Sequence, residues 1–113
     1  MNIACGVDLV YLPRFKKSLK RGGENFLRRI YHEQELIKND TAHLAGIFAA
    51  KEAVIKALKL PIDSWHDIKV IKNSKGAPSI ELTTYNLQLT TYSLSISHDH
   101  NYVIAQFVAI LKE

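Results

Sequence analysis

The feature that most constrains the fold is an alanine-rich segment between Thr41 and Leu58. Asp40 and Thr41 are both good N-cap residues, and Pro61 stops a helix soon after Leu58. Apolar residues recur between them at the 3.6-residue spacing of a helix. Alanine forms helices readily and lets another backbone approach closely. We therefore predict a closely packed helix over 41–58, with small side chains at Ala45, Ala49, Ala50, Ala53 and Ala57.

The segments on either side of this helix differ in character. Ile3–Val10 alternates between two faces and is typical of a strand. Pro13 suits the first turn of a helix that Gly22-Gly23 would break. Further short helices are expected over 24–30 and 32–38, and further strands over 67–72, 78–82, 92–96 and 102–111. The order predicts an α+β fold: an N-terminal strand, several helices, then an antiparallel β-meander.

Length and composition fit one globular domain over residues 1–113. The chain is 47% hydrophobic and 23% charged, which is close to the globular average and argues against disorder. Its apolar runs are too short to span a bilayer, and Met1–Asp8 does not resemble a signal peptide. The single cysteine, Cys5, cannot form an intrachain disulfide. We therefore expect a cytoplasmic protein without a membrane span.

Positive charge is concentrated between Arg14 and Arg29, where the lone acid is Glu24. A basic segment of this kind speeds encounter with an acidic partner. The partner could be a nucleic acid, an anionic membrane surface or an acidic protein, or the segment could be a solvated helix face. Charge alone does not choose between them. The basic residues are Arg14, Lys16, Lys17, Lys20, Arg21, Arg28 and Arg29.

A carboxylate interrupts the N-terminal apolar strand. Asp8 follows Gly6 by two residues, and burying it without a partner would cost several kcal/mol. It must therefore meet solvent, a cation or hydrogen-bond donors. It could be a residue at a solvated rim, a member of a structural ion pair, or part of a functional site.

Charged residues also occur inside the alanine-rich helix. Glu52 and Lys56 are one turn apart, a spacing that by itself stabilises a helix by roughly 0.3–0.5 kcal/mol. Small residues around Lys51 and Glu52 leave room for a ligand or a second backbone. His98 ends a predicted strand; with His100 it makes a poor zinc site, because no cysteine or further histidine stands at ligand spacing.

Several motifs together point to one family. They are Gly6–Val10 followed by Arg14, Leu44–Leu58, Gly76–Pro78, Leu94–Asp99 and Tyr102–Ala105. In order and spacing, over nearly the whole chain, they resemble the holo-acyl-carrier-protein synthase family of 4′-phosphopantetheinyl transferases. The Gly-x-Asp strand combined with the Lys51-Glu52-Ala53 helix is the specific part of this resemblance.

The resemblance implies an enzyme that moves the 4′-phosphopantetheine group of coenzyme A to a serine of an apo acyl carrier protein and releases 3′,5′-ADP. It implies Mg²⁺ bound by Asp8 and Glu52, as a hard cation with one or two carboxylates would be. Glu52 would take the serine proton, directly or through a metal-bound water, and Lys56 would stabilise or protonate the leaving phosphate. Lys51, Lys56 and His98 would contact coenzyme A.

The resemblance also gives the basic segment a partner. Acyl carrier proteins are acidic, so Arg14, Lys17 and Arg21 would form the docking surface. The resemblance further implies a homotrimer with sites at subunit interfaces. No membrane partner is expected. No nucleic-acid partner is expected either, because the basic residues are not interleaved with an aromatic ladder or set in a recognised binding motif.

Two positions depart from the family pattern. Ile47 stands where the family usually has an arginine that contacts a nucleotide phosphate. After Leu58 the family has a Gly-rich turn, whereas this chain has Lys59-Leu60-Pro61. Weaker coenzyme A binding is the expected consequence, with Lys59 restoring part of the charge. The alternative function is a non-catalytic module of the same fold that binds the carrier protein, and the sequence leaves the carrier's pathway open.

Overall fold

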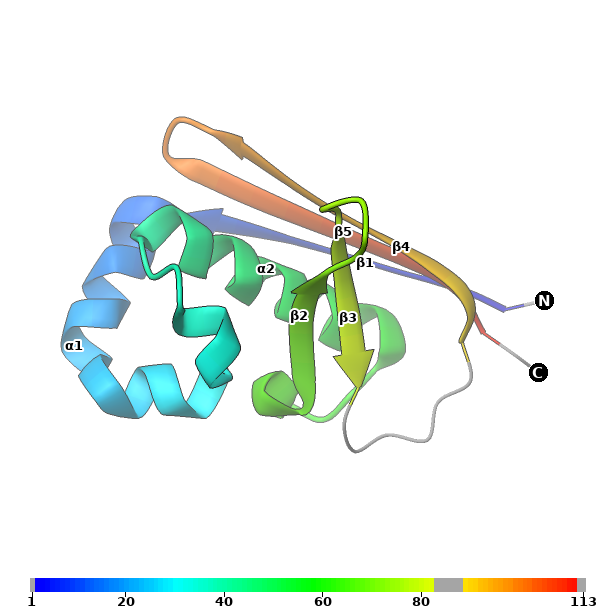
Figure 1. Ribbon diagram of the computed structural model, residues 1–113, viewed down its shortest axis with the longest axis horizontal. Coiled ribbons are helices and arrows are strands. Elements are labelled where there is room, and N and C mark those ends of the chain that lie inside the picture. Colours follow the sequence, from blue (N-terminus) through cyan, green and yellow to red (C-terminus); the bar gives the residue numbers. More distant parts are fainter. Residues whose placement is uncertain (1, 83–88, 112–113) are drawn as a thin grey trace.

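The computed structural model describes residues 2–82 and 89–111, and Figure 1 shows their arrangement. The helices are α1 (Leu12–Ile30), α2 (Thr41–Leu58) and the short 3₁₀ helices η1 (Glu33–Leu36) and η2 (Ser64–Asp67). The strands are β1 (Asn2–Tyr11), β2 (Ile68–Lys72), β3 (Pro78–Leu82), β4 (Leu89–Asp99) and β5 (Tyr102–Leu111). This order confirms the predicted α+β class.

The strands form two antiparallel sheets. One has the order β1-β5-β4, and the other is the β2-β3 hairpin. The expected meander is therefore divided, and β5 takes the centre of the larger sheet because the first strand pairs with the last. In that pairing Asp8 stands opposite Ala105. In Figure 1 the helices and the hairpin lie on one side of this sheet.

Helix α2 is the central element and has the predicted bounds. The Asp40 carboxylate caps it by accepting a hydrogen bond from the backbone N–H of His43 at 3.3 Å. Its small side chains are buried against β1 and β5, which place Phe107 and Val103 in the same core. Ala45, Ala49, Ala50 and Ala53 are 0% exposed. The alanine-rich face thus brings two backbones together, as the sequence predicted.

Helix α1 contains the predicted break. Gly23 has φ 54° and ψ −139°, a backbone conformation that residues with a side chain rarely adopt. The break divides the basic segment into two parts: Arg14–Arg21 lies before it, and Arg28 and Arg29 lie in the last turn of the helix. The helix expected over 32–38 is instead the single 3₁₀ turn η1.

The other face of the larger sheet is apolar and uncovered in one copy of the chain. Ile3 and Leu9 of β1 are 68% and 61% exposed, and Tyr102 and Ile104 of β5 are exposed as well. Side chains alternate across a strand, so the residues between these face α2. Over residues 2–82 and 89–111, no helix has the length and apolarity needed to cross a membrane.

Candidate active site

The site begins where β1 crosses α2. A Cβ atom at Gly6 would stand 2.0 Å from the carbonyl oxygen of Ala53, so only glycine permits this approach. With the strand lying directly on the helix, Asp8 is carried to the turn that bears Lys56. The Lys56 ammonium donates to the Asp8 carboxylate at 2.9 Å and to the Val7 carbonyl at 3.1 Å. Asp8, the predicted interruption of the strand, therefore has a cationic partner.

Glu52 lies on the face of α2 that is turned towards Asp8. One turn before it, Phe48 lines a cavity together with Asp8; one turn after it, Lys56 bonds Asp8. Residues four apart share a helix face, so Glu52 stands between these two contacts. Its Oε2 accepts a hydrogen bond from the indole N–H of Trp65 at 2.8 Å.

The donor set at this crossing suits a hard cation. Asp8 and Glu52, on different elements, offer carboxylate oxygens, which are the type of ligand that such a cation takes. In the described part of the chain, three or more metal-ligating side chains never come together. An all-protein cage would need more ligands, but Mg²⁺ commonly uses one or two carboxylates plus water and substrate phosphates. The residues present therefore fit Mg²⁺ that is bound jointly with a phosphorylated substrate.

A cavity of about 230 Å³ connects Asp8 with the basic helix. Phe15, Phe26 and Phe48 give it apolar walls, and Arg14 also lines it. Arg14, Lys17 and Arg21 are all exposed, and their spacing of three and four residues places them on one face of α1. The structure thus sets Arg14 beside the candidate site, and Lys17 and Arg21 follow it on the same face of α1.

Lys51 does not lie where the family resemblance placed it. Its side chain is 0% exposed, and its ammonium donates to the Glu35 carboxylate at 2.7 Å and to the Ile30 carbonyl at 2.6 Å. Burial lowers the pKa of Lys51, and the Glu35 carboxylate opposes that shift. The expectation that Lys51 contacts coenzyme A phosphate is wrong for this structure, because the ammonium is sealed in the core.

Glu35, which the sequence analysis missed, organises this core. Its Oε1 also accepts from the His32 backbone N–H, and its Oε2 from the Val70 backbone N–H, both at 2.7 Å. A buried carboxylate with these partners ties η1, α2 and β2 together. A glutamate in a short polar stretch gives no sign of burial in the sequence.

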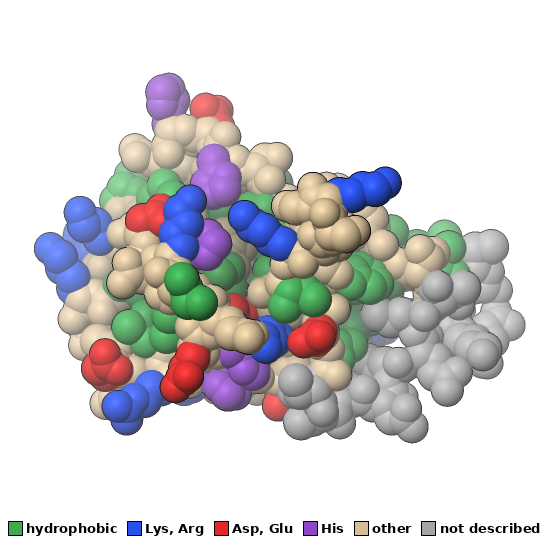
Figure 2. Space-filling model, in the orientation of Figure 1, with side chains coloured by type: hydrophobic (Ala, Val, Ile, Leu, Met, Phe, Trp, Pro, Cys, Tyr) green, Lys and Arg blue, Asp and Glu red, His purple; other side chains and the backbone are tan. Residues whose placement is uncertain are grey.

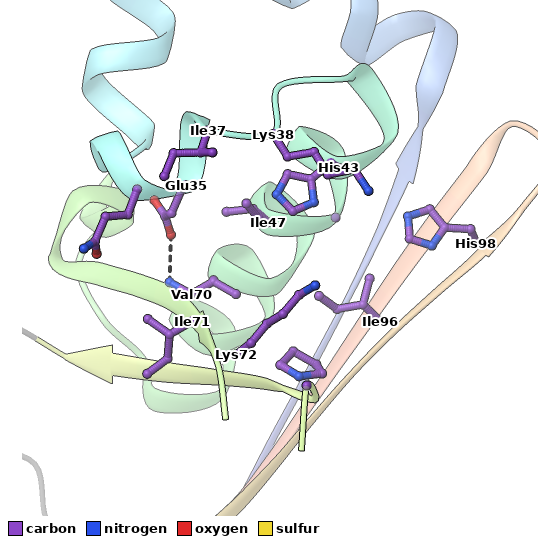
Figure 3. Close-up of a pocket in the computed structure, with 14 residues that line it drawn as sticks. Glu35, Ile37, Lys38, His43, Ile47, Val70, Ile71, Lys72, Ile96 and His98 are labelled. Atoms are coloured by element: carbon purple, nitrogen blue, oxygen red, sulfur yellow. Dashed lines mark hydrogen bonds between the residues drawn. The ribbon is translucent and has the colours of Figure 1, made fainter. Parts of the chain in front are cut away.

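A second cavity, of about 530 Å³, lies between η1, α2, the β2-β3 hairpin and β4 (Figure 3). Lysine and histidine side chains gather on this face of the molecule in Figure 2. Lys38, His43, Lys72 and His98 line the cavity in company with Glu35. Burial lowers the pKa of His43, and Asp40 partly opposes the shift. Among these, sequence analysis named only His98.

Apolar side chains complete this cavity. Ile47, Ile71 and Ile96 line it, and Figure 3 shows Ile47 lying between the hairpin and His43. Ile47 is 5% exposed, so it belongs both to the buried face of α2 and to the cavity wall. The arrangement can hold a flat apolar group and attract phosphate at its cationic rim.

The turn after α2 has left-handed backbone at residues other than glycine. Lys59 adopts the left-handed conformation, with φ 54°, that glycine usually supplies. Asp63 does the same with φ 69°. The backbone therefore turns sharply here without the glycines that the family pattern has.

Comparisons with known proteins agree with this geometry. The 4′-phosphopantetheinyl transferase superfamily pattern matches residues 4–107. A holo-[acyl-carrier-protein] synthase of Campylobacter jejuni is 44% identical, with 98% of this chain and 100% of the relative covered. One from Thermodesulfovibrio yellowstonii is 40% identical, with 93% and 95% covered.

Solved structures give the same result. The Helicobacter pylori holo-[acyl-carrier-protein] synthase in complex with coenzyme A superposes with a TM-score of 0.83 at 37% identity, covering 94% of this chain and 99% of that one. A coenzyme A complex of the Chronobacterium ammoniagenes enzyme gives a TM-score of 0.84 at 27% identity, with 100% of both chains covered. The chain belongs to the holo-acyl-carrier-protein synthase family of the 4′-phosphopantetheinyl transferase superfamily.

Proposed function

We propose that this chain transfers the 4′-phosphopantetheine group of coenzyme A to a serine of an apo acyl carrier protein and releases 3′,5′-ADP. The observation that carries the proposal is the contact of β1 with α2 at Gly6. It brings Asp8 to the helix face of Glu52 and Lys56, although the strand and the helix are separated in sequence by the whole of α1 and η1. The names of the relatives and the coenzyme A complexes of the solved neighbours support the same activity.

Asp8 and Glu52 would hold Mg²⁺ in this reaction. When bound, the ion supplies charge neutralisation at the pyrophosphate of coenzyme A. The Lys56 ammonium, which neutralises Asp8 in this structure, belongs to a side chain that is 53% exposed and can turn to a phosphate once another cation meets the carboxylate. A carboxylate that leaves water without a partner is costly. In this exchange the metal ion would take the place of Lys56 beside Asp8, so the carboxylate would always have a cationic partner and the exchange would cost little.

The chemical step is a phosphoryl transfer. The serine oxygen attacks the β-phosphorus, forming one P–O bond as the bond to the α-phosphate oxygen breaks. Glu52 would accept the serine proton, and Lys56 would stabilise the charge that develops on the leaving 3′,5′-ADP. Both groups stand on one face of α2, so one rigid helix fixes their separation.

Coenzyme A would place its nucleotide end in the cavity of about 530 Å³. The isoleucine side chains there suit the adenine ring, and His98 with Lys38, His43 and Lys72 suits the phosphates. Lys38 and Lys72 would replace the charge of the arginine that family members carry at the position of Ile47. The affinity for coenzyme A would then be weakened less than the loss of that arginine alone implies.

The acidic carrier would dock on the exposed face of α1 formed by Arg14, Lys17 and Arg21. The cavity of about 230 Å³ that leads from Arg14 to Asp8 would receive the part of the carrier that bears the serine. The uncovered apolar face of the β1-β5-β4 sheet would be buried by further copies of the chain in a homotrimer. Exposed apolar surface of this extent commonly marks an interface.

Mass spectrometry of an apo carrier protein tests the function. Incubation with the chain, coenzyme A and Mg²⁺ should add one phosphopantetheine group to the carrier. Asp8→Asn and Glu52→Gln should each slow this addition by orders of magnitude, while Glu33→Gln, at an exposed carboxylate on η1, should not. Carrier binding without any mass increase would instead establish the non-catalytic module.

A further inference from the structure

Trp65 lies beside the candidate catalytic residue Glu52. Two side chains pack on its ring, and its indole N–H donates a hydrogen bond. Its indole packs on Phe48 with ring centroids 6.0 Å apart. The Arg29 guanidinium lies over the ring, 5.7 Å from its centroid. The indole N–H, which can only donate, reaches Glu52 Oε2 at 2.8 Å. Helices α1, α2 and η2 thus meet at one half-buried ring.

This contact acts on the orientation of Glu52. A glutamate side chain rotates about three bonds, and its end group is broadly distributed unless something holds it. A carboxylate has about four acceptor sites in total. The Trp65 N–H takes one of them, on Oε2, and the remaining sites can receive a cation or a substrate proton. Because the donor belongs to a packed planar ring, its position is fixed before any ligand arrives.

We propose that Trp65 is a positioning residue for Glu52, and this proposal rests on the proposed function. It fixes Oε2 of the carboxylate at the indole N–H, one helical turn before Lys56, which contacts Asp8. The residue acts through Glu52 and contacts neither substrate nor reacting atoms. Groups that orient a metal ligand or catalytic base typically contribute about 10- to 100-fold in metal affinity or activity.

The decisive variant is Trp65→Phe, which keeps an aromatic ring and removes the N–H. It should lower kcat by about 10- to 100-fold and raise the Mg²⁺ concentration for half-maximal rate. The KM for the carrier protein should stay within about twofold, because the docking face on α1 is untouched. The control is Tyr31→Phe, which removes the 2.7 Å bond from the Tyr31 hydroxyl to the Leu44 carbonyl, away from Glu52. It should lower the melting temperature and leave kcat unchanged.

A second readout needs no turnover. Trp65 is the single tryptophan of the chain, so tryptophan emission reports on this ring alone. Titration with MgCl₂ in the presence of coenzyme A should change the emission with the half-saturation found for transfer. Glu52→Gln should remove that response. Circular dichroism melts of every variant separate a loss of positioning from a loss of fold.

The outcomes distinguish this proposal from the proposed function. If Glu52→Gln abolishes transfer while Trp65→Phe retains the wild-type kcat and Mg²⁺ requirement, the positioning role is wrong and the function stands. An emission that ignores Mg²⁺ in the wild type would also overturn the positioning role. If the wild-type chain transfers nothing, the proposed function fails and the role of Trp65 fails with it.

Discussion

Replacement of Lys51 separates a structural role from a phosphate-binding role. In Lys51→Met the methionine fills most of the side-chain volume, but Glu35, a residue that is 3% exposed, loses its cationic partner. Breaking a buried pair by removing one partner costs about 3–5 kcal/mol. For a domain of this size that lowers the melting temperature by roughly 10–25 °C.

A double variant tests the cause of that loss. In Lys51→Met combined with Glu35→Gln no unpaired charge is buried, and the amide oxygen introduced at position 35 can still accept one backbone N–H from His32 or Val70. The double variant should therefore be more stable than the sum of the two single losses predicts, by about 1 kcal/mol or more. Urea unfolding, followed by far-UV circular dichroism, measures the free energy of unfolding of both single variants and of the double variant, each relative to the wild type.

Kinetics complete the test. Below its melting temperature, Lys51→Met should keep the wild-type KM for coenzyme A, because the ammonium is sealed from the cavity. A variant with wild-type stability and a strongly raised KM for coenzyme A would refute the structural role. That result would instead support the contact between Lys51 and coenzyme A phosphate that the family resemblance implied.

Four other contacts can be tested in the same way. Gly6→Ala should destabilise the domain by about 2 kcal/mol or more and abolish transfer, since its Cβ would overlap the Ala53 carbonyl; thermal melts and transfer assays measure both effects. Arg14→Glu should raise the KM for the carrier far more than that for coenzyme A, and added salt should mimic it; equal effects on both substrates would place docking elsewhere. Lys72→Gln should weaken coenzyme A binding about tenfold in calorimetry, and an unchanged affinity would remove it from the phosphate site. Because burial lowers the pKa of His43 below 6.5, its imidazole gains charge only in mildly acidic solution; coenzyme A should bind more tightly there than at neutral pH, and His43→Gln should reduce that gain.

Local features of the fold were predictable because their causes lie within a few residues. The bounds of α2 follow from Asp40 at the N-cap and from a run of good helix formers, and the structure has the same bounds. The Gly22-Gly23 break and the strand over 78–82 follow from turn chemistry and alternation. The family motifs likewise carried the membership, because they are short patterns at fixed spacing.

Other features depend on contacts between distant segments, which periodicity does not encode. The pairing of β1 with β5 joins the two ends of the chain, and it fixes the sheet that carries Asp8 across α2. The sequence places Lys51 inside the alanine-rich helix, but only packing shows that its ammonium is buried against Glu35. A charged side chain can be buried when a partner of opposite charge lies beside it. For Lys51 that partner is Glu35 of η1, 16 residues earlier in the sequence.

The candidate site divides in the same way. The sequence by itself determined the chemical groups: the carboxylates of Asp8 and Glu52, the Lys56 amine and the basic residues of α1. Tertiary structure decided their use. It supplied Trp65 as the donor to Glu52, and it assembled Lys38, His43 and Lys72 around one cavity from separate segments. The reason is physical, because residue type sets what a group can bind, whereas the packing of β1, η1, η2 and the hairpin on α2 sets what lies within reach.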